Sequence, residues 1–366
     1  MISSLASEFG LELKAVIRAR PLEKKVLDRL DSWLGEGRAG EMDWLEKGRP
    51  VMADLRDWKP WVKSAALFSL PFHRPGGGFL GGGRVARYAL GKDYHHVMGR
   101  KLEKLGKRLR ADGEVEAFRG AVDAAPVLEK EWALRGGLGF RGKNTLLLDP
   151  ENGPWTFLGE LLVDAQWKEW IPERDFGKGC GGCTKCLDAC PTGALDDPWS
   201  LEPRKCISYW TIEAKGPVPR ELRESFGDWV FGCDICSEAC PFGAGADNFE
   251  DDWGTLPALK TWSLEDLLAV SPRDFSTAFE GSPIRRAGWE GMARNACIAL
   301  GNLGQGGSTL KRTLESHPSP LVRGHAAWAL GRLGEKPPLE RAWKREKDPF
   351  PSQEIEEALH TFSTVI

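Results

Sequence analysis

Apolar residues recur every three or four positions through much of residues 1–48, with charged residues between them. That spacing places them on one face of a helix, so we expect this stretch to be helical. The run 62–70 differs because it is mostly apolar and is followed by a proline, which is the pattern of a buried strand. The glycine tract 76–83 lacks the Lys-Ser or Lys-Thr of a phosphate-binding loop, and we interpret it as a flexible surface loop.

The next stretch combines helices with short strands. A basic amphipathic helix is expected at 93–110, and a short strand at 117–123 leads Asp123 into the loop before Pro126. With the elements before them, they predict an α+β domain over residues 1–170. The other elements expected here are a helix at 128–134, a tight glycine-rich turn at 136–145, and a hairpin formed by 146–148 and 155–163.

Two similar segments lie in the last part of the chain. The sequence ALGNLG at 299–304 returns as ALGRLG at 329–334, a spacing of 30 residues, with a proline-containing breaker between them. This pattern predicts a short pair of HEAT-like helical repeats, which present a binding surface. Cys297 lies among apolar residues of the first segment, and we expect it to be a buried core thiol.

The repeat region is rich in basic residues, and two interpretations of them remain open. They can form a solvated helix face, or they can follow the phosphate groups of a nucleic acid. The residues are Arg285, Arg286, Arg294, Lys311, Arg312, Arg323 and Arg332.

The cysteines supply the strongest chemical signal. Cys180, Cys183, Cys186 and Cys190 follow the spacing C-x2-C-x2-C-x3-C-P, which bacterial two-cluster ferredoxins use. Three thiolates in a tight loop can hold one face of a cubane cluster, whereas the fourth is carried onward by the following helix and ligates a different cluster.

A second cysteine group completes the ligand count. It ends in the same C-x3-C-P pattern but is one ligand short, and Cys206 is available between the two groups. Structural zinc has no use for the Cys-Pro endings, and disulfides suit small secreted chains. We therefore predict two [4Fe–4S] clusters, one held by Cys180, Cys183, Cys186 and Cys240, the other by Cys190, Cys206, Cys233 and Cys236.

Composition and charge limit the possible number of domains, binding partners and cellular locations. A chain of 366 residues can form two or three domains, and a net charge of −3 gives no general nucleic-acid signature. Any contact with RNA must therefore use a local basic patch. No apolar run approaches the ~18 residues of a membrane helix, so we expect no membrane association. The first residues lack a secretory signal, and together with thiolate-bound clusters this predicts a cytoplasmic protein.

Short motifs spread over nearly the whole chain carry a resemblance to a known family. They are GEMDWL at 40–45, RYALGKDYH at 87–95, VDAAPVLE at 122–129, GLGFRGKN at 137–144, LGE at 158–160, CPTGAL at 190–195 and RKCISY at 204–209. In their order and spacing they resemble the epoxyqueuosine reductases.

The resemblance implies a reaction and its cofactors. These enzymes reduce epoxyqueuosine to queuosine at the wobble position of the tRNAs for aspartate, asparagine, histidine and tyrosine. The epoxide oxygen leaves as water, which consumes two electrons and two protons. The family uses cobalamin, with cob(II)alamin as the resting form, and two [4Fe–4S] clusters supply the electrons. An external low-potential donor must reduce the clusters, and a monomer is sufficient.

The implied architecture has three parts. Residues 1–170 form the α+β cobalamin-binding domain, 171–250 a ferredoxin-like module with two clusters, and 251–366 the HEAT-like all-α repeats. Two other functions remain open. One is a cobalamin and iron–sulfur reductase of a small molecule, similar to reductive dehalogenases. The other is a ferredoxin-type electron-transfer protein fused to a scaffold.

The resemblance also implies site residues. Asp123 matches the family's general acid and lies at the cofactor, and we expect nearby apolar residues to raise its pKa and keep it protonated. The alternative is that Asp123 caps the helix expected at 128–134. The other positions that match cobalamin contacts are Arg56, Lys143, Asn144, Leu147, Leu158 and Ser208.

Two features of the sequence depart from cobalamin-binding patterns. Relatives usually carry a basic residue where this chain has Met52, and Arg56 is the substitute that we consider. Asp93 and His95 resemble the start of a motif in which a histidine ligates cobalamin, but the glycine comes one residue late, at Gly99. We interpret that match as a coincidence, which agrees with the family.

Overall fold

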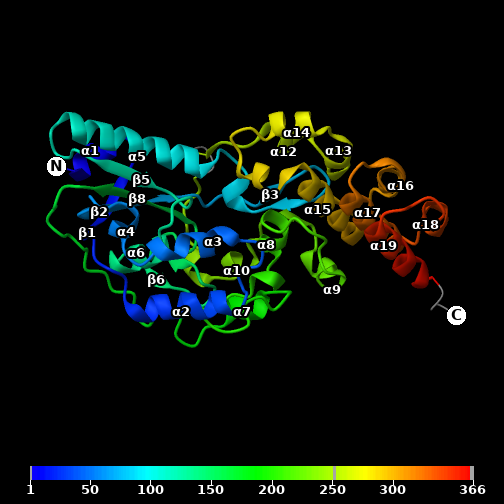
Figure 1. Ribbon diagram of the computed structural model, residues 1–366, viewed down its shortest axis with the longest axis horizontal. Coiled ribbons are helices and arrows are strands. Elements are labelled where there is room, and N and C mark those ends of the chain that lie inside the picture. The colour runs from blue at the N-terminus through cyan, green and yellow to red at the C-terminus, as the bar shows by residue number, and fades with distance from the viewer. Residues whose placement is uncertain (1, 250–252, 363–366) are drawn as a thin grey trace. The chain divides into compact units, whose positions relative to one another are not determined.

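The computed structural model describes residues 2–249 and 253–362. The chain divides into two compact units, each assembled from separate segments. Unit one comprises residues 1–75, 92–203 and 234–253, and unit two comprises residues 76–91, 204–233 and 254–366. Figure 1 labels most of the helices and strands of both units. No helix in the described part of the chain is both long and apolar enough to cross a membrane.

Unit one is built on a four-stranded antiparallel sheet with the order β1-β2-β8-β5. Helix α5 (Tyr94–Ala111) packs on one face, and α6 (Glu129–Arg135) packs against β8. Gly159 of β8 lets α5 approach, because a Cβ there would lie 2.6 Å from the terminal methyl of Met98. The strands are β1 (Glu12–Arg18), β2 (Ser64–Pro71), β5 (Phe118–Ala121) and β8 (Thr156–Val163).

The expectation of helix throughout residues 1–48 is wrong at β1. The five inner residues of this strand are all buried, so it lacks the alternation that reveals a half-exposed strand. Its Lys14 forms an ion pair with Glu12 at 2.7 Å, which keeps a charge in a largely buried strand. The helices of this region are α1 (Ile2–Glu8), α2 (Lys24–Gly35), α3 (Asp43–Gly48) and α4 (Leu55–Trp58).

The strands expected at 62–70 and 117–123 are confirmed as β2 and β5, but the expected hairpin is wrong. The short strand β7 (Leu147–Leu148) pairs with β6 (Phe140–Arg141), whereas β8 joins the large sheet between β2 and β5. The glycine-rich turn thus connects β6 and β7. Two further helices of unit one are α7 (Lys185–Ala189) and α10 (Ile235–Glu238).

Unit two contains a three-stranded sheet of β3 (Gly77–Gly78), β4 (Arg84–Val85) and β9 (Trp229–Phe231). The glycine tract contains β3 and the tight turn that joins it to β4, so the expectation of a loop throughout is wrong. Gly76, Gly77, Leu80 and Gly81 are exposed, as expected for a surface segment. Its last three glycines have φ values of 78°, 132° and 95°, which side chains other than glycine rarely adopt. A Cβ at Gly83 would lie 2.5 Å from the side chain of Leu264.

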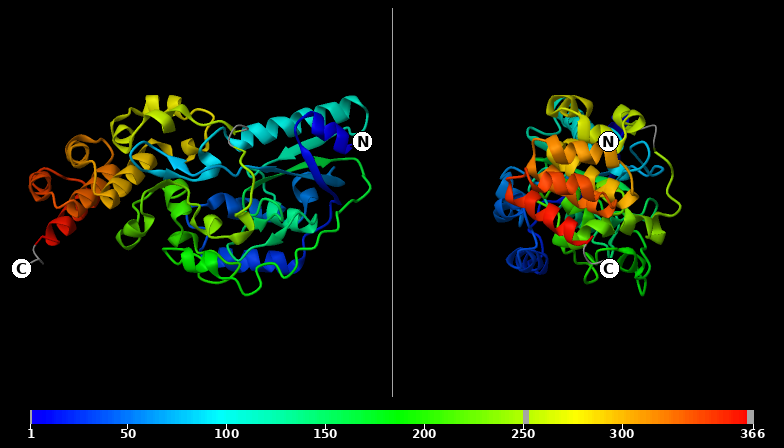
Figure 2. Two further views of the ribbon diagram at one scale, coloured as in Figure 1. Left: turned by 180° about the vertical axis from the view of Figure 1, so that it is seen from behind. Right: turned by 90° about the vertical axis from the view of Figure 1, so that its right-hand side faces the viewer.

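The last part of unit two is helical, as expected. The central glycine of each repeated motif lies where helices pack closely, because a Cβ at Gly301 would meet Ala329 and one at Gly331 would meet Ala358. Figure 2 shows these helices from yellow to red. They are α15 (Gly288–Leu303), α16 (Gly307–Ser316), α17 (Pro320–Arg332), α18 (Lys336–Trp343) and α19 (Pro349–His360).

Shorter helices complete unit two. Cys297 lies within α15 and is fully buried, which confirms the expected core thiol, and burial raises the pKa of this thiol. The short helices are α8 (Ile207–Ile212), α9 (Arg220–Arg223), α12 (Pro257–Thr261), α13 (Leu264–Ala269) and α14 (Pro272–Ala278).

Candidate active site and cluster ligands

Asp123 lies in the loop between β5 and α6, as expected. Its backbone has a φ of 50°, which is uncommon for a residue other than glycine. The N–H of Ala124 donates to the carbonyl of Val122 at 2.5 Å, so Asp123 is the middle residue of a three-residue turn. This conformation is strained and persists only where other contacts hold it.

Glu129 supplies one of those contacts. Its Oε1 accepts a hydrogen bond from the backbone N–H of Asp123. Because Glu129 is the first residue of α6, the loop is tied to the start of this helix. The alternative in which Asp123 caps α6 is wrong, since the N-cap position is Leu128 and no side chain caps it.

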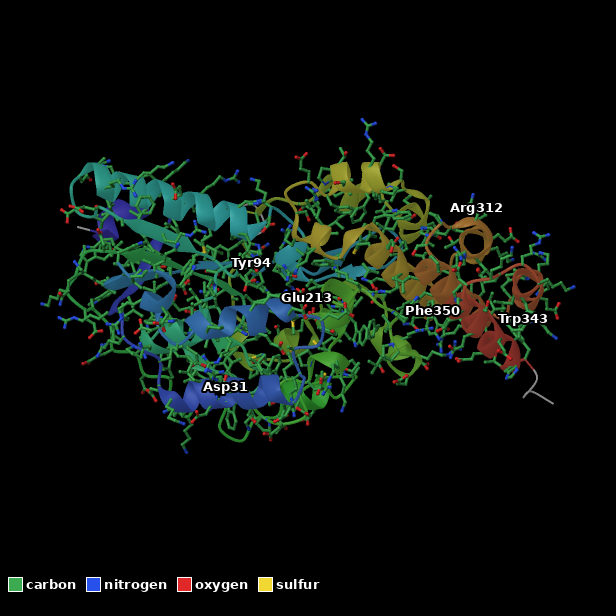
Figure 3. All side chains as sticks on the ribbon, viewed as in Figure 1. Asp31, Tyr94, Glu213, Arg312, Trp343 and Phe350 are labelled. Atoms are coloured by element: carbon green, nitrogen blue, oxygen red, sulfur yellow. The ribbon has the colours of Figure 1, made fainter. Side chains whose placement is uncertain are left out.

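Two residues at the start of α5 contact the carboxyl group of Asp123. The hydroxyl of Tyr94 donates to Oδ2 of Asp123, and Nε2 of His95 lies 3.5 Å from the same oxygen. Nδ1 of His95 lies 2.7 Å from Oδ1 of Asp93, which also caps α5 by accepting the His95 backbone N–H. Figure 3 labels Tyr94 at this end of the helix. Carboxylates therefore face both ring nitrogens of His95, which agrees with treating the histidine-ligand motif as a coincidence.

The charge state at Asp123 differs from the expectation. Burial alone would raise the pKa of Asp123, but hydrogen bonds from His95 and Tyr94 outweigh it, and the pKa is lowered. Burial would lower the pKa of His95, but Asp123 and Asp93 outweigh it and raise this pKa to about 9. At neutral pH the proton is therefore held by His95, and the expectation of a protonated Asp123 is wrong for this arrangement.

Two further carboxyl groups lie close to Asp123. Glu160 of β8 is 1% exposed, and its Oε2 has no hydrogen-bond partner among the described residues. Burial raises the pKa of Glu160 well above its ordinary value, and negative charge on Glu129 and Asp123 adds to that shift. Burial and Asp123 likewise raise the pKa of Glu129. The sequence signal for Glu160 is a single carboxyl group within an otherwise apolar strand.

Lys130 connects this cluster to the glycine-rich turn. Its Nζ donates to the carbonyl of Thr145 at 3.3 Å, and burial lowers the pKa of the amine. Asp123 and Lys130 are both exposed, yet both are strongly desolvated by surrounding protein. A ligand that covered the exposed parts of these groups would displace water from them.

The residues expected to touch cobalamin lie in several places. Lys143 is buried and donates to the carbonyl of Gly181 at 2.9 Å, and the Asn144 amide lies 3.5 Å from the carbonyl of Cys236. Both side chains thus hold cysteine-bearing segments. Their cofactor role stays a prediction, as it does for Leu147, which is buried, Leu158, which is half-buried, and Ser208, which lies in α8 of unit two.

The departure at Met52 has a structural counterpart. Met52 is 4% exposed, so an apolar side chain lies in the interior at the position where the family resemblance predicts a basic residue. Arg56 forms an ion pair with Asp54, with Nε 2.9 Å from Oδ1, and its side chain is 48% exposed. The role of Arg56 as a substitute stays a prediction.

The first predicted cluster has all its ligands in unit one. Burial raises the pKa of Cys186 and of Cys240, and nearby thiols reinforce the effect: Cys180 acts on both and Cys183 acts on Cys240. Helix α7, which contains Cys186, packs against α10. Backbone N–H groups of Phe242 and Gly243 also lower the pKa of Cys240, as amides that point toward a thiolate do. Cys240 therefore lies near Cys180, Cys183 and Cys186, and the assignment of these four sulfurs to one cluster stays a prediction.

The second predicted cluster draws its ligands from both units. Cys190 follows α7, with its sulfur 3.6 Å from the Thr192 hydroxyl, and Cys236 lies in α10 of unit one. Cys206 and Cys233 belong to unit two. Their assignment to one cluster stays the prediction made from spacing.

The basic residues of the repeat region form internal contacts. Arg294 is 1% exposed, and its guanidinium donates to the carbonyls of Trp210, Ala214 and Gly216. Arg323 is paired with Glu346, with Nε 2.8 Å from Oε2. Neither of the two interpretations, a solvated helix face or a track along phosphates, therefore describes these two arginines. Arg286, Lys311 and Arg332 also have acidic partners, which are Glu213, Glu335 and Glu224.

Comparison with known proteins places these features in a family. The family model described as "Epoxyqueuosine reductase QueG, DUF1730" matches residues 53–124, which include Asp123. A second model, "4Fe-4S double cluster binding domain", matches residues 179–243. The epoxyqueuosine reductase of Pseudomonas aeruginosa is 41% identical over 84% of this chain and 87% of its own length. The Escherichia coli protein of the same name is 37% identical over 84% and 83%.

The chain belongs to the epoxyqueuosine reductase family. It is an oxidoreductase with a double [4Fe–4S] cluster domain. The crystal structure of an epoxyqueuosine reductase with a tRNA-Tyr stem loop carrying epoxyqueuosine has a TM-score of 0.87 and 29% identity, covering 99% of this chain and 98% of that one. A Bacillus subtilis epoxyqueuosine reductase, with its catalytic aspartate loop swung out of the active site, has a TM-score of 0.83 and 29% identity over 98% and 97%.

Proposed function

We propose that this chain reduces epoxyqueuosine to queuosine at the wobble position of tRNA. The observation that carries the proposal is the network of Asp123, Tyr94 and His95, which places a carboxyl group beside a charged imidazole in the unit that also carries the first cluster's cysteines. Loss of the epoxide oxygen requires protons at that oxygen and electrons at the adjacent carbon. This chain has a proton donor, Asp123, in the segment that matches the epoxyqueuosine reductase model. The segment that matches the double-cluster model supplies the clusters that carry electrons.

In this proposal Asp123 is the general acid. It is ionised while it faces His95, so it must first accept a proton, and His95 is the adjacent group that holds one at neutral pH. Proton transfer from His95 to Asp123 leaves both groups neutral. The protonated carboxyl group then donates to the epoxide oxygen, which is a poor leaving group unless it is protonated. Tyr94 orients the carboxyl group through its hydroxyl.

The loop that carries Asp123 is suited to movement. Its strained turn at Asp123 depends on the contact with Glu129. The related Bacillus subtilis enzyme has a structure in which its catalytic aspartate loop is swung out of the active site. We infer that the Asp123 loop can open in the same way and that the hydrogen bonds to Glu129 and Tyr94 mark its closed position.

Cobalamin is the proposed organic cofactor, and the groups around Asp123 fit it. A corrin needs apolar walls and polar groups for its amides, and half-buried Leu158, Leu128 and Ala125 accompany the exposed polar groups of Asp123 and Lys130. Asp123, Arg56, Lys143, Asn144, Leu147, Leu158 and Ser208 are the residues proposed to hold it. When bound, cobalamin would supply the electron-rich centre that attacks the epoxide. The protein's own residues orient the substrate and move the protons.

The helical part of unit two is the proposed tRNA-binding surface. We propose that its helix pairs are HEAT-like repeats, which present such surfaces. With Arg294 and Arg323 excluded, the proposed contacts are Lys344 and Arg345, which are exposed and have no ion pair among the described residues. Trp343 precedes them at the end of α18 and is 45% exposed, so it can stack on a base (Figure 3).

Other properties follow from the same proposal. The functional domains are 1–170, 171–250 and 251–366, the protein works as a monomer in the cytoplasm, and an external low-potential donor reduces the clusters. The resting cofactor is cob(II)alamin.

The test is anaerobic conversion of tRNA that carries epoxyqueuosine. Reconstituted protein with cobalamin and a reductant is incubated with this tRNA, and the digested nucleosides are analysed by mass spectrometry for loss of one oxygen. Asp123→Asn should abolish conversion with both clusters intact, whereas Asp112→Asn, at the exposed end of α5, should convert normally. No conversion by the loaded protein would contradict the proposal and favour a small-molecule substrate.

A further inference from the structure

Glu160 is the least expected titratable group in unit one. It lies in the third of four strands, paired with Leu67 of β2 and Ala121 of β5, and it is 1% exposed. Successive side chains of a strand point to opposite faces. Gly159 faces α5, so Glu160 points to the other face with Leu158 and Leu162, on the side that packs with α6.

The surroundings of Glu160 do not support a charge. The Leu67 that pairs with it is apolar, and its Oε2 has no hydrogen-bond partner among the described residues. The charged groups that act on it are Glu129 from α6 and Asp123 from the loop after β5, and both are acidic. A buried carboxylate with two acidic neighbours and a free oxygen is costly, so Glu160 keeps a proton.

Glu129 connects Glu160 to Asp123. Its Oε1 accepts the Asp123 backbone N–H, and the charges that act on it are Asp123, His95 and Lys130. The positive groups among these, His95 and Lys130, also act on Asp123, so they favour negative charge on Asp123. Of the three carboxyl groups, Glu129 and Glu160 therefore hold a proton more readily than Asp123 does.

We propose that half-buried Glu129 and buried Glu160 form a carboxyl pair that holds one proton, on Glu160, and returns it to Asp123 during each turnover. This inference rests on the proposed function, because it needs Asp123 to be the acid. The reaction consumes two protons, while Asp123 can pass on only one at a time. His95 holds one of them, and the carboxyl pair holds the other.

The step involves proton transfer alone. After Asp123 has given a proton to the leaving oxygen, the O–H bond of Glu160 breaks and an O–H bond forms on Glu129. That O–H bond of Glu129 breaks in turn and an O–H bond forms on Asp123, so one proton has moved and the negative charge has passed from Asp123 to Glu160. Asp123 donates the second proton and the oxygen leaves as water. When product departs, water reaches Asp123 again and the pair is reprotonated through it. In this proposal both glutamates act through Asp123.

Infrared spectroscopy of the full-length holoprotein tests the stored proton without any turnover. The carbonyl stretch of a protonated carboxyl group lies apart from the carboxylate bands and shifts in D2O. We expect such a band at neutral pH in the wild type, its loss in Glu160→Gln, and its retention in Glu103→Gln, a matched change on the exposed face of α5. A spectrum without this band in the wild type, or with the same band in Glu160→Gln, would overturn the proposal.

Turnover supplies the second readout. Glu160→Gln should lower the steady-state rate at least about tenfold, leave the KM for tRNA unchanged, and increase the solvent isotope effect, because the second proton must then come from water. An unchanged rate and isotope effect would overturn the proposal. If the wild type shows the band but converts no epoxyqueuosine, the proposed function fails while the buried proton stands.

A second variant covers the case in which Glu160→Gln does not fold. Glu129→Gln keeps an acceptor for the Asp123 backbone N–H but removes one acidic neighbour of Glu160. The pH at which the infrared band disappears should therefore fall relative to the wild type. A band that titrates at the same pH in both proteins would show that the two carboxyl groups do not interact, which would overturn the pair.

Discussion

Nε2 of His95 lies 3.5 Å from Oδ2 of Asp123, while Nδ1 of the same ring lies 2.7 Å from Oδ1 of Asp93. The imidazole is therefore held between two carboxylates. Burial alone would favour a neutral ring, but the two acidic partners raise its pKa to about 9. The site therefore holds its proton on His95, and Asp123 is its ionised partner.

This arrangement makes stability depend on pH. The folded-state pKa of His95 is above its ordinary value of about 6.5, so the stabilisation is fully present below pH 6.5 and is lost as pH rises through about 9. We expect the free energy of unfolding of the wild type to fall by on the order of 1–2 kcal/mol more than that of His95→Gln between pH 6.5 and 10. Anaerobic urea unfolding of both proteins measures the difference, and parallel pH curves would contradict it.

The Tyr94→Phe variant tests the role of the Tyr94 hydroxyl while the aromatic ring is retained. The ring stacks on Phe157 with centroids 4.2 Å apart and planes 3° from parallel, and Phe preserves this contact. The hydroxyl lowers the pKa of Asp123, so its removal should raise that pKa and move upward the alkaline limb of the pH–rate profile, where the acid loses its proton. We expect a loss of about 1 kcal/mol of stability and a roughly tenfold slower turnover.

A control addresses the ring itself. Phe157→Leu weakens the stacking, which contributes about 0.5–1.5 kcal/mol, but leaves the Tyr94 hydroxyl on Asp123. The alkaline limb of its pH–rate profile should not move. If both variants shift the limb equally, the hydroxyl has no specific effect on Asp123.

Two cysteines in different environments test the ligand assignment. Cys240 lies near Cys180 and Cys183, so Cys240→Ser should remove the first cluster and about half of the bound iron. Cys297→Ser, in the interior of α15, should retain all the iron and its electron paramagnetic resonance signals. Iron analysis and spectroscopy after anaerobic reconstitution measure both. Equal iron content in the two variants would contradict the assignment of Cys240.

Substitutions of different basic residues in unit two should affect either the stability of the protein or its binding of tRNA. Arg294→Met leaves three backbone carbonyls without their donor, so we expect a loss of about 2–4 kcal/mol of stability. Lys344→Gln with Arg345→Gln removes two exposed charges, so stability should change little. The slope of log affinity for tRNA against log salt should fall by about 1–2.

The salt titration includes its own control. Arg312→Gln removes another exposed-face charge of the repeats, whose guanidinium contacts the Thr309 hydroxyl, and Figure 3 labels it away from Trp343. It should leave the tRNA salt slope unchanged. A normal slope for the Lys344 and Arg345 variant would remove the end of α18 from the proposed tRNA surface.

The sequence predicted the elements whose cause is local. The apolar run at 62–70 forms β2, and the helix expected at 93–110 forms α5 with Asp93 as its cap. The prediction from sequence failed at β1 and at the expected hairpin, because there the structure depends on which strands pair with one another. The burial of β1 on both faces removes its alternation, and β8 pairs with β2 and β5, which are far from it in the chain.

The sequence by itself determined the cysteine spacing, the repeated helices and the family motifs around Asp123, because each depends on residues close together in the chain. The tertiary structure decided the charge states. It places His95 and Tyr94 on Asp123, buries Glu160 behind it, and turns Arg294 from a candidate phosphate contact into an internal clamp. A pKa depends on desolvation and on charges brought from other elements, and neither is visible before the chain has folded.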